Sequence, residues 1–394
     1  MRQLPLMPPE FAPHFAPADA AISRRMSLHA LAAAGLGLST WALAPSARAL
    51  PIKSLQFPRD FGSHPDLQTE WWYITGQLQA GGKPWGFQLT FFRSRIAAAQ
   101  SLQSPLAAKQ LIFAHAALCD VQGQKLHHDQ RMARAGLGLS DASESDTHVY
   151  INDWYLKRQS VPGKDAVQAS RYSAKLAAKD FTLDLEFDST QHLLLQGSNG
   201  LSRKGPQEEQ ASYYYSQPQL RVSGSITLGK QRLPVQASPH NRAWLDHECS
   251  AAIMDKDAQG WDWIGMNLDD GSALTAFHLR RPDGSALWAG GSFRQAGENA
   301  QIFSANQVQF EPLRYWSSPH SKARYPVAWR VQTPAGRFEV HALVDDQELD
   351  SRASTGAIYW EGLCELRHIA SDGRSSPVGR GYLEMTGYVS AMKL

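Results

Sequence analysis

The run RAWLDHE, residues 242–248, carries the side chains of this sequence that are best suited to chemistry. It reads as a strand, in which successive side chains point to opposite faces, so Trp244, Asp246 and Glu248 share one face. Leu245 and His247 take the other. A carboxylic acid that burial keeps protonated can protonate an alkene carbon. We therefore predict Asp246 as a general acid, with Glu248 holding water or raising the pKa of Asp246 by like-charge repulsion.

A second run, GWDWIG, follows at 260–265 and adds two indoles on one strand face. Aromatic faces attract a cation by about 1 to 2 kcal/mol when water is excluded, so they suit a carbocation intermediate. Two further aromatic runs, EWWY and SYYYS, could contribute to the same wall. The predicted ligand-binding residues are Trp71, Tyr73, Tyr213, Tyr215, Trp244, Trp261 and Trp263. The alternative is that the indoles are barrel core, with Trp71 plugging a barrel base, and that the acids are solvated strand residues.

Hydrolytic and metal-dependent chemistry find less support in the sequence. There is no G-x-S-x-G elbow, and Ser238 and Ser250 lack any nucleophile motif. A zinc site would need His240 or His247, but no H-E-x-x-H is present and His247 faces away from the acids. No dinucleotide fingerprint is present either. We predict no metal and no cofactor.

The N-terminus is typical of an exported protein. A Pro- and Ala-rich lead is followed by SRRMSL at 23–28, by a mildly apolar run at 30–44 and by Ala47-Arg48-Ala49. This pattern predicts a twin-arginine signal over residues 1–49, with cleavage near Ala49 by the usual A-x-A rule. The apolar run is shorter than the roughly 20 residues of a membrane span. We expect a periplasmic or secreted protein that meets the twin-arginine export machinery and does not insert stably into the membrane.

Composition narrows the partners of the mature chain. Without the first 49 residues it has 35 basic and 35 acidic side chains, with no basic stripe for a nucleic acid. Cys119, Cys249 and Cys364 are too few for a disulfide framework, and Cys249 reads as a small buried apolar residue. Its tryptophans and Tyr213-Tyr214-Tyr215 could line a cavity for a hydrophobic small molecule.

Short alternating runs dominate the rest of the chain and predict an all-β fold. WYITGQL at 72–78 and FTLDLEF at 181–187 are examples, separated from their neighbours by Gly-Gly and Asp-Gly turns. About 345 mature residues suit two domains. A weak repeat, in which each half begins with a tryptophan strand, places them at 57–230 and 240–394. The Ala- and Gln-rich segment 97–110 interrupts the strand rhythm and is predicted as a helix or lid.

Several motifs, in order, resemble those of the AttH/CrtC lipocalin-like family, whose members are described as predicted secreted hydrolases or carotenoid 1,2-hydratase-like proteins. They include HPDLQTEWWY at 64–73, WLDHE, GWDW, YWEG at 359–362 and GYLEMTGY at 381–388. The resemblance implies two tandem lipocalin-like antiparallel β-barrels. It also implies a hydratase or hydrolase-like enzyme acting on an apolar small molecule, with Trp244 and Asp246 at the positions of an aromatic residue and an acid. The alternative is a binder or carrier of a hydrophobic ligand in the periplasm.

Overall fold

The structure, a computed structural model, describes residues 49–251 and 254–392. The predicted export signal, apart from its last residue, lies outside these ranges. Within them, no helix has the length and apolar character needed to cross a membrane.

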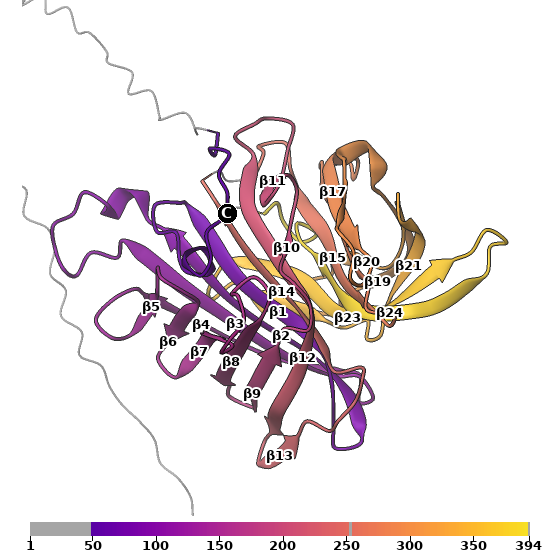
Figure 1. Cartoon of the computed structure of the whole chain (residues 1–394), viewed down its shortest axis with the longest axis horizontal. Coiled ribbons are helices and arrows are strands. Elements are labelled where there is room, and N and C mark those ends of the chain that lie inside the picture. Colours follow the sequence, from indigo (N-terminus) through magenta and orange to yellow (C-terminus); the bar gives the residue numbers. More distant parts are fainter. Residues whose placement is uncertain (1–48, 252–253, 393–394) are drawn as a thin grey trace, which may run out of the picture. The chain divides into compact units, whose positions relative to one another are not determined.

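Strands form two antiparallel sheets, as Figure 1 shows, and the all-β prediction is confirmed. The strands of the first sheet are β1 (Thr69–Ala80), β2 (Lys83–Arg95), β3 (Gln110–Asp120), β4 (Lys125–Arg134), β5 (Ser140–Ala142), β6 (His148–Ile151), β7 (Trp154–Ser160), β8 (Ser170–Ala177), β9 (Phe181–Asp188), β10 (Leu194–Leu195), β11 (Leu201–Arg203), β12 (Ala211–Leu228), β13 (Gln231–Pro234) and β14 (Arg242–Ser250). Those of the second are β15 (Gly260–Leu268), β16 (Ala273–Arg280), β17 (Ala286–Arg294), β18 (Gln301–Phe303), β19 (Gln309–Ser317), β20 (Arg324–Thr333), β21 (Gly336–Ala342), β22 (Glu348–Ser351), β23 (Ala357–Ile369) and β24 (Ser375–Met385).

Helical structure in the described ranges is confined to three single 3-10 turns: η1 (Arg59–Phe61), η2 (Ala97–Ala99) and η3 (Ala305–Gln307). The predicted helix over 97–110 is therefore wrong. Only η2 forms there, and the chain then runs through turns to the start of β3. Pro105 gives a physical reason, because it lacks the N–H that a continuing helix would need.

The first sheet nearly closes into a barrel. Its strand order is β4-β3-β2-β1-β14-β12-β9-β8-β7-β6-β5. Strands near the two ends of this order come together, because β3 contacts β5 and β6, and β4 contacts β6. Arg131 on β4 also donates a hydrogen bond of 2.9 Å to the carbonyl of Ala177 at the end of β8. Trp72, Trp85 and Trp154 fill the interior and are almost completely buried.

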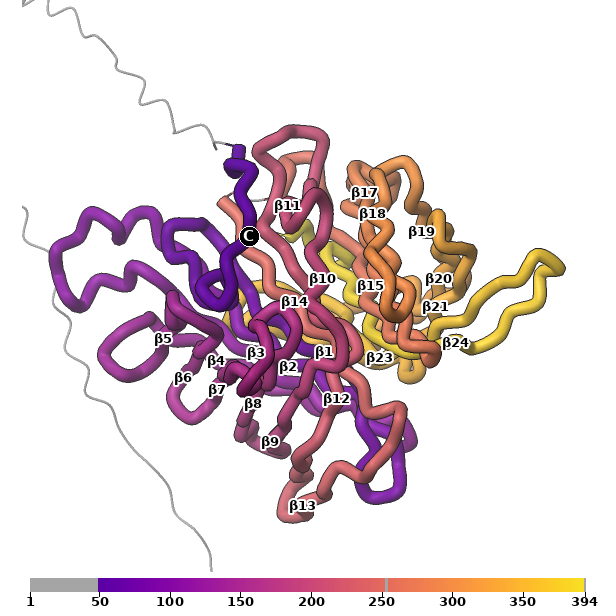
Figure 2. Tube along the Cα trace, viewed as in Figure 1, coloured from indigo at the N-terminus to yellow at the C-terminus, as the bar shows by residue number. Residues whose placement is uncertain are grey.

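Strand β14 belongs to the first sheet, which corrects the predicted boundary at 230–240. It pairs with β1 on one side and with β12 on the other, and Figure 2 shows it beside β1. The sheets divide after it, between Ser250 and Gly260. Without β14, the facing edges of β1 and β12 would leave backbone donors and acceptors unpaired, and buried groups of that kind are costly. The proposed repeat, which opened the second half with the Trp244 strand, placed the boundary one strand too early.

The second sheet has the order β18-β17-β16-β15-β24-β23-β21-β20-β19 and its own apolar core around Trp329 and Trp360. A separate apolar cluster joins the two sheets. It combines Tyr73 on β1 and Trp244 on β14 with Trp263 on β15, together with residues of β16, β23 and β24. The candidate site lies in this cluster.

Candidate functional site

A cavity of about 170 Å³ lies between the two sheets and is lined by acidic and aromatic side chains. Strands β1, β2, β12 and β14 supply one wall, and β15, β16, β23 and β24 supply the other. Its principal lining residues are Trp71, Tyr73, Phe92, Tyr214, Trp261, Trp263, Phe277, Tyr359, Asp246, Glu248, Glu361 and Glu384. Size and lining together suit a small apolar ligand with one or two polar groups.

The register of β1 and β14 explains why the predicted acids meet the predicted aromatics. Tyr73 lies directly opposite Asp246, and Trp71 lies directly opposite Glu248. Side chains of directly opposed residues in an antiparallel pair project from the same face. The alternation read from the sequence therefore places both acids and both rings toward the cavity.

Asp246 is the most completely hydrogen-bonded acid of the cavity. Its Oδ1 accepts from the Trp244 indole at 2.7 Å and from the Ser216 hydroxyl at 2.5 Å, while its Oδ2 accepts from the Tyr214 hydroxyl at 2.7 Å. Burial raises its pKa from 3.8 to about 7, against the lowering effect of these three donors. Asp246 therefore exchanges its proton near neutral pH, where a general acid or base is most effective.

Tyr214 replaces the tyrosines that the sequence favoured. The register of β12 with β14 pairs Tyr214 with Glu248, so Tyr214 faces the cavity and its two neighbours face away. Tyr213 donates to the carbonyl of Pro51 at 2.6 Å, and Tyr215 packs in the core of the first sheet. Tyr213 and Tyr215 therefore do not line the cavity, contrary to the prediction. Strand alternation shows that Tyr214 lies on the opposite face from Tyr213 and Tyr215, but not which of the two faces is turned toward the cavity. The register with the neighbouring strand decides that.

Glu248 has a cationic partner, whereas Asp246, Glu361 and Glu384 have no ion pair with any residue that the structure describes. Lys204 places its Nζ 3.0 Å from Glu248 Oε1, and the Ser212 hydroxyl donates to the same oxygen. The Lys204 ammonium also lies 4.3 Å from the ring centre of Tyr214 and 4.5 Å from that of Phe277. Glu248 and Lys204 therefore form the polar corner of an otherwise aromatic cavity.

Two further acids, Glu361 on β23 and Glu384 on β24, belong to the motifs YWEG and GYLEMTGY, and the sequence indicated no role for them. They lie directly opposite each other in the second sheet and both line the cavity. Burial, and for Glu361 the charge of Glu384, raises the pKa of both. Two buried carboxylates side by side cannot both ionise cheaply, so the pair retains a proton. In the sequence, Glu361 lies two residues after Tyr359 and Glu384 lies two residues after Tyr382, so each acid shares a strand face with a tyrosine. Nothing in the sequence indicates that β23 and β24 face β14.

Tyr73 bridges the two groups of acids. Its buried hydroxyl interacts with the carboxyl group of Glu361 and with the hydroxyl of Thr75. Burial, together with the charges of Glu361 and Glu384, raises the Tyr73 pKa well above 10.0. Tyr73 therefore keeps its proton and can donate it in a hydrogen bond.

The structure thus brings Asp246, Glu248, Trp71, Tyr73, Trp261 and Trp263 around one cavity, as predicted. Trp244 lies behind it: the ring is 1% exposed and its N–H is bound to Asp246, so it positions the acid and does not line the cavity. The binding and catalytic roles remain predictions.

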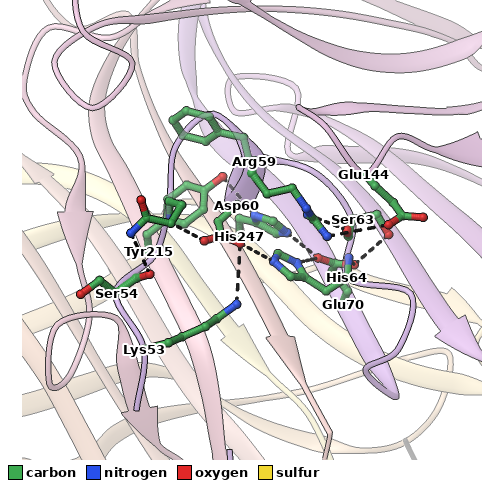
Figure 3. Close-up of polar contacts among 12 residues, drawn as sticks. Lys53, Ser54, Arg59, Asp60, Ser63, His64, Glu70, Glu144, Tyr215 and His247 are labelled. Carbon is green, nitrogen blue, oxygen red and sulfur yellow. Dashed lines mark hydrogen bonds and ion pairs between the residues drawn. The ribbon is translucent and has the colours of Figure 1, made fainter. Parts of the chain in front are cut away.

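The opposite face of β14 carries a second cluster of ionisable residues, shown in Figure 3. Glu70 is its centre. Its Oε1 is 2.7 Å from His64 Nδ1 and 2.9 Å from His247 Nε2, and its Oε2 accepts from Arg93 Nε at 2.9 Å. Asp60 lies 2.9 Å from the other nitrogen of His64. We call these five residues the Glu70 cluster.

Charges in the Glu70 cluster are paired and their pKa values move accordingly. Burial opposes ionisation of Glu70, but its bonds to His247 and His64 hold its pKa well below 4.5. Burial likewise opposes protonation of His64, yet the bonds to Asp60, Cys249 and Glu70 raise its pKa to about 11. Burial lowers the pKa of His247, which is therefore neutral: it donates to Glu70 and accepts from the Tyr215 hydroxyl at 3.0 Å.

His64, Glu70 and Cys249 place potential ligand atoms within 4.8 Å of one another. The donor set does not favour a cation there. His64 is protonated, the Arg93 guanidinium already neutralises Glu70, and burial raises the pKa of the Cys249 thiol to about 11. The cluster instead fixes the segment that carries η1 against β14, and so fixes the strand that carries Asp246.

Comparison with known proteins decides the family. The AttH-like family model matches residues 48–388. The chain belongs to the AttH-like family. A crystal structure of a protein assigned as AttH from Nitrosomonas europaea is 46% identical, covers 87% of this chain and 100% of its own, and superposes with a TM-score of 0.76.

More distant relatives share the fold of this AttH-like protein. Kievitone hydratase from Nectria haematococca is 16% identical, with 82% of this chain and 89% of its own covered and a TM-score of 0.59. CghA in complex with Sch210972 is 12% identical, with 83% and 90% covered and a TM-score of 0.55. None of the curated proteins compared with the chain matches it in sequence. At such identities the likeness concerns the fold alone.

Proposed function

We propose that this AttH-like protein is an enzyme that adds water to an unsaturated apolar small molecule by acid catalysis in the cavity between its sheets. One observation carries the proposal: Asp246, with a pKa raised to about 7 by burial, faces a cavity with aromatic walls. A proton available at neutral pH and rings that tolerate positive charge are the two requirements of alkene hydration.

The proposed reaction begins with the protonated carboxyl group of Asp246. Its O–H bond breaks as the proton forms a C–H bond with one alkene carbon, leaving a carbocation on the other. Trp263 and Tyr73 line the cavity where the cation would form. The oxygen of a water molecule then bonds to the cation, and the proton released by that water returns to Asp246. The residue thus ends as it began, and the same steps in reverse remove water.

The remaining acids support this step in two ways. Glu248 with Lys204 forms the polar corner where the attacking water would be held. Glu361 and Glu384 retain a proton between them and so limit the Tyr73 side of the cavity to one negative charge. The shared fold with a protein named as a hydratase is consistent with the proposal, though at 16% identity it carries no argument about substrate.

The test uses Asp246→Asn, because the amide keeps the shape of the carboxyl group but cannot deliver its proton. The mature protein and the variant are incubated with a panel of phenolic alkenes and polyenes, and products heavier by one water are sought by mass spectrometry. We expect turnover to fall by about 10² to 10⁴-fold while ligand binding and melting temperature change little. Tyr213→Phe is the matched control outside the cavity. A stable Asp246→Asn protein with normal turnover would contradict the proposal.

A carrier of an apolar ligand is the second candidate, favoured by the aromatic lining of the cavity. It predicts that small molecules copurify with the exported protein and bind equally well to wild type and Asp246→Asn, with no chemical change in either. Untargeted mass spectrometry of the copurified fraction separates the two functions.

We also propose that the protein acts in the periplasm or outside the cell after twin-arginine export. The support is Arg24-Arg25, the short apolar run and the A-x-A motif before Leu50. Wild-type protein should have its N-terminus at or near Leu50, and replacing both arginines by lysine should retain the precursor in the cytoplasm. Unchanged export of the double-lysine variant would remove the twin-arginine assignment.

A further inference from the structure

A second cavity, of about 120 Å³, opens at the same junction of the two sheets. Several strands that line the first cavity also line this one, through residues further along each strand. On β14, Asp246 lines the first cavity, and Trp244 and Arg242 line the second. On β1, Tyr73 lines the first, and Thr75 and Gln77 line the second. Trp244, whose indole is bound to Asp246, stands between the two cavities. We call this second space the arginine cavity.

Two arginines line the arginine cavity, Arg242 on β14 and Arg380 on β24. The Arg242 guanidinium also donates to the carbonyl of Asn241 at 3.2 Å. Gln77 lies between the two arginines: it is directly opposite Arg242 in the register, and its Oε1 accepts from Arg380 Nη1 at 3.0 Å. Neither arginine forms an ion pair with any residue in the described ranges 49–251 and 254–392. Both are partly buried, so the two positive charges are incompletely solvated.

The acids around the cavity leave these charges uncompensated. Asp269 is the acidic lining residue; its side chain is 63% exposed, and one oxygen is 3.9 Å from His240 at the rim. Glu365 is directly opposite Arg380 on β23, but its carboxylate is bound to Arg367 at 2.8 Å. The arginine cavity therefore carries a net positive charge, in contrast to the acidic cavity on the other side of Trp244.

Two further lining residues come from β1 and β15. Thr75 lines the arginine cavity and is completely buried, and its hydroxyl interacts with the Tyr73 side chain. A Cβ on Gly265 would come within 2.4 Å of the Trp263 ring and 3.1 Å of Trp244, so glycine lets these two indoles pack beside the cavity. Two guanidinium groups that line one cavity without a carboxylate partner in the described part of the chain are a donor set for an oxyanion.

We propose that the arginine cavity binds the carboxylate group of a small organic acid. The planar forks of Arg242 and Arg380 match the two oxygens of a carboxylate. The cavity volume admits a small acid and excludes a long acyl chain. The site lies beyond the proposed hydration chemistry, because its lining residues do not include the acids of the first cavity.

The test measures binding of propionate to the mature protein by titration calorimetry at constant ionic strength, with sodium chloride as the blank. We expect saturable binding that Arg242→Gln and Arg380→Gln each weaken by at least about tenfold, since each removes a charge-assisted pair. Arg242→Lys, which keeps the charge but loses the fork, should lie between. Arg221→Gln is the matched control: it is directly opposite Arg242 but is paired with Asp188 outside the cavity, and it should bind like wild type.

Several outcomes would overturn the assignment. No propionate binding, or equal loss in Arg221→Gln and Arg380→Gln, would show that the arginines are not a site. Binding of phosphate or sulfate in place of propionate would contradict the carboxylate class. Asp246→Asn, in the other cavity, should leave propionate binding unchanged, and a loss there would mean that the two cavities are one site.

Discussion

The two faces of β14 carry similar ionisable residues in different electrostatic settings. On one face, Asp246 meets hydroxyl and indole donors and no cation, and burial raises its pKa to about 7. On the other face, His247 meets Glu70, which is itself bound by His64 and Arg93. Each charge of the Glu70 cluster is thus paired, whereas the acid of the cavity is left to hold a proton.

This difference separates a structural role from a chemical one. Paired charges in a buried network stabilise one arrangement and have pKa values far from neutral, so they do not exchange protons at physiological pH. The protein loses stability when an acid in an aromatic pocket without a cation ionises. This cost raises the pKa of the acid, which therefore still carries a proton near neutral pH and can donate it. A strand whose alternate residues face these two environments can anchor the site from behind while presenting the acid in front.

Replacing Glu70 should have the largest effect on stability. Glu70→Gln keeps the shape but leaves Arg93 without its counter-charge in a buried site and leaves His64 with Asp60 alone. We expect the free energy of unfolding to fall by about 3 to 5 kcal/mol, as when one partner of a buried ion pair is removed. Urea unfolding measures it. Glu361→Gln is the matched control on the cavity side, where no cation depends on the acid, and it should change the value by less than about 1 kcal/mol. Equal losses would erase the distinction between the faces.

The dependence of stability on pH should show the two faces separately. Glu70 and Asp60 have pKa values below their unfolded ones, about 2 for Asp60, so their contribution is present above pH 4.5 and is lost as the pH falls. Asp246 has a raised pKa, so its contribution is full below 3.8 and is lost as the pH rises to about 7.

Urea unfolding between pH 2 and 8 should therefore give a maximum near pH 4 to 5, with a decline of a few kcal/mol toward neutral pH. Asp246→Asn should lessen the neutral decline, to which Glu361, Glu384 and, above pH 6.5, His64 also contribute, and should leave the decline at acid pH unchanged. If Asp246→Asn lost the decline at acid pH instead, the two titrations would have been assigned to the wrong faces of β14.

A smaller effect separates Tyr214 from its neighbours. Tyr214→Phe removes one of the three hydrogen bonds that favour ionised Asp246, so the Asp246 pKa should rise by about one unit. Tyr213→Phe loses only the bond to Pro51 and should leave that pKa unchanged. The carboxyl titration of both variants, followed by infrared spectroscopy, checks this. An identical shift in the two would show that Tyr214 does not act through Asp246.

Strand alternation predicted the faces within single strands and could not predict which strands meet. It placed Asp246 with Glu248 and His247 on the opposite side, and the structure agrees. It chose the wrong tyrosines, because the face of SYYYS depends on its register with β14. It missed Glu384, which reaches the site because the two sheets pack together there. Glu384 is more than 100 residues from Asp246 in the sequence, and no local pattern predicts such a contact.

The same limit explains the misplaced domain boundary. The turn residues Gly229, Pro234 and Pro239 indicate a break in the strands, and β12 and β13 do end there. Whether the next strand rejoins the first sheet depends on the open edges of β1 and β12, which are far away in sequence. Turn chemistry marks where strands end, while edge pairing decides to which sheet the next strand belongs.

Infrared titration of the protonated carboxyl band, between pH 4 and 9, tests the central claim most directly. The account predicts a band that persists above pH 6 in the mature protein, with a component of pKa near 7 that is smaller in Asp246→Asn by one carboxyl group and remains there because burial also raises the pKa of Glu384 to about 7. The triple variant Asp246→Asn, Glu361→Gln, Glu384→Gln should lack the persistent band altogether. Loss of the whole band below pH 5 in the wild-type protein would contradict the account, because no acid of the cavity would then hold a proton where the proposed chemistry needs it.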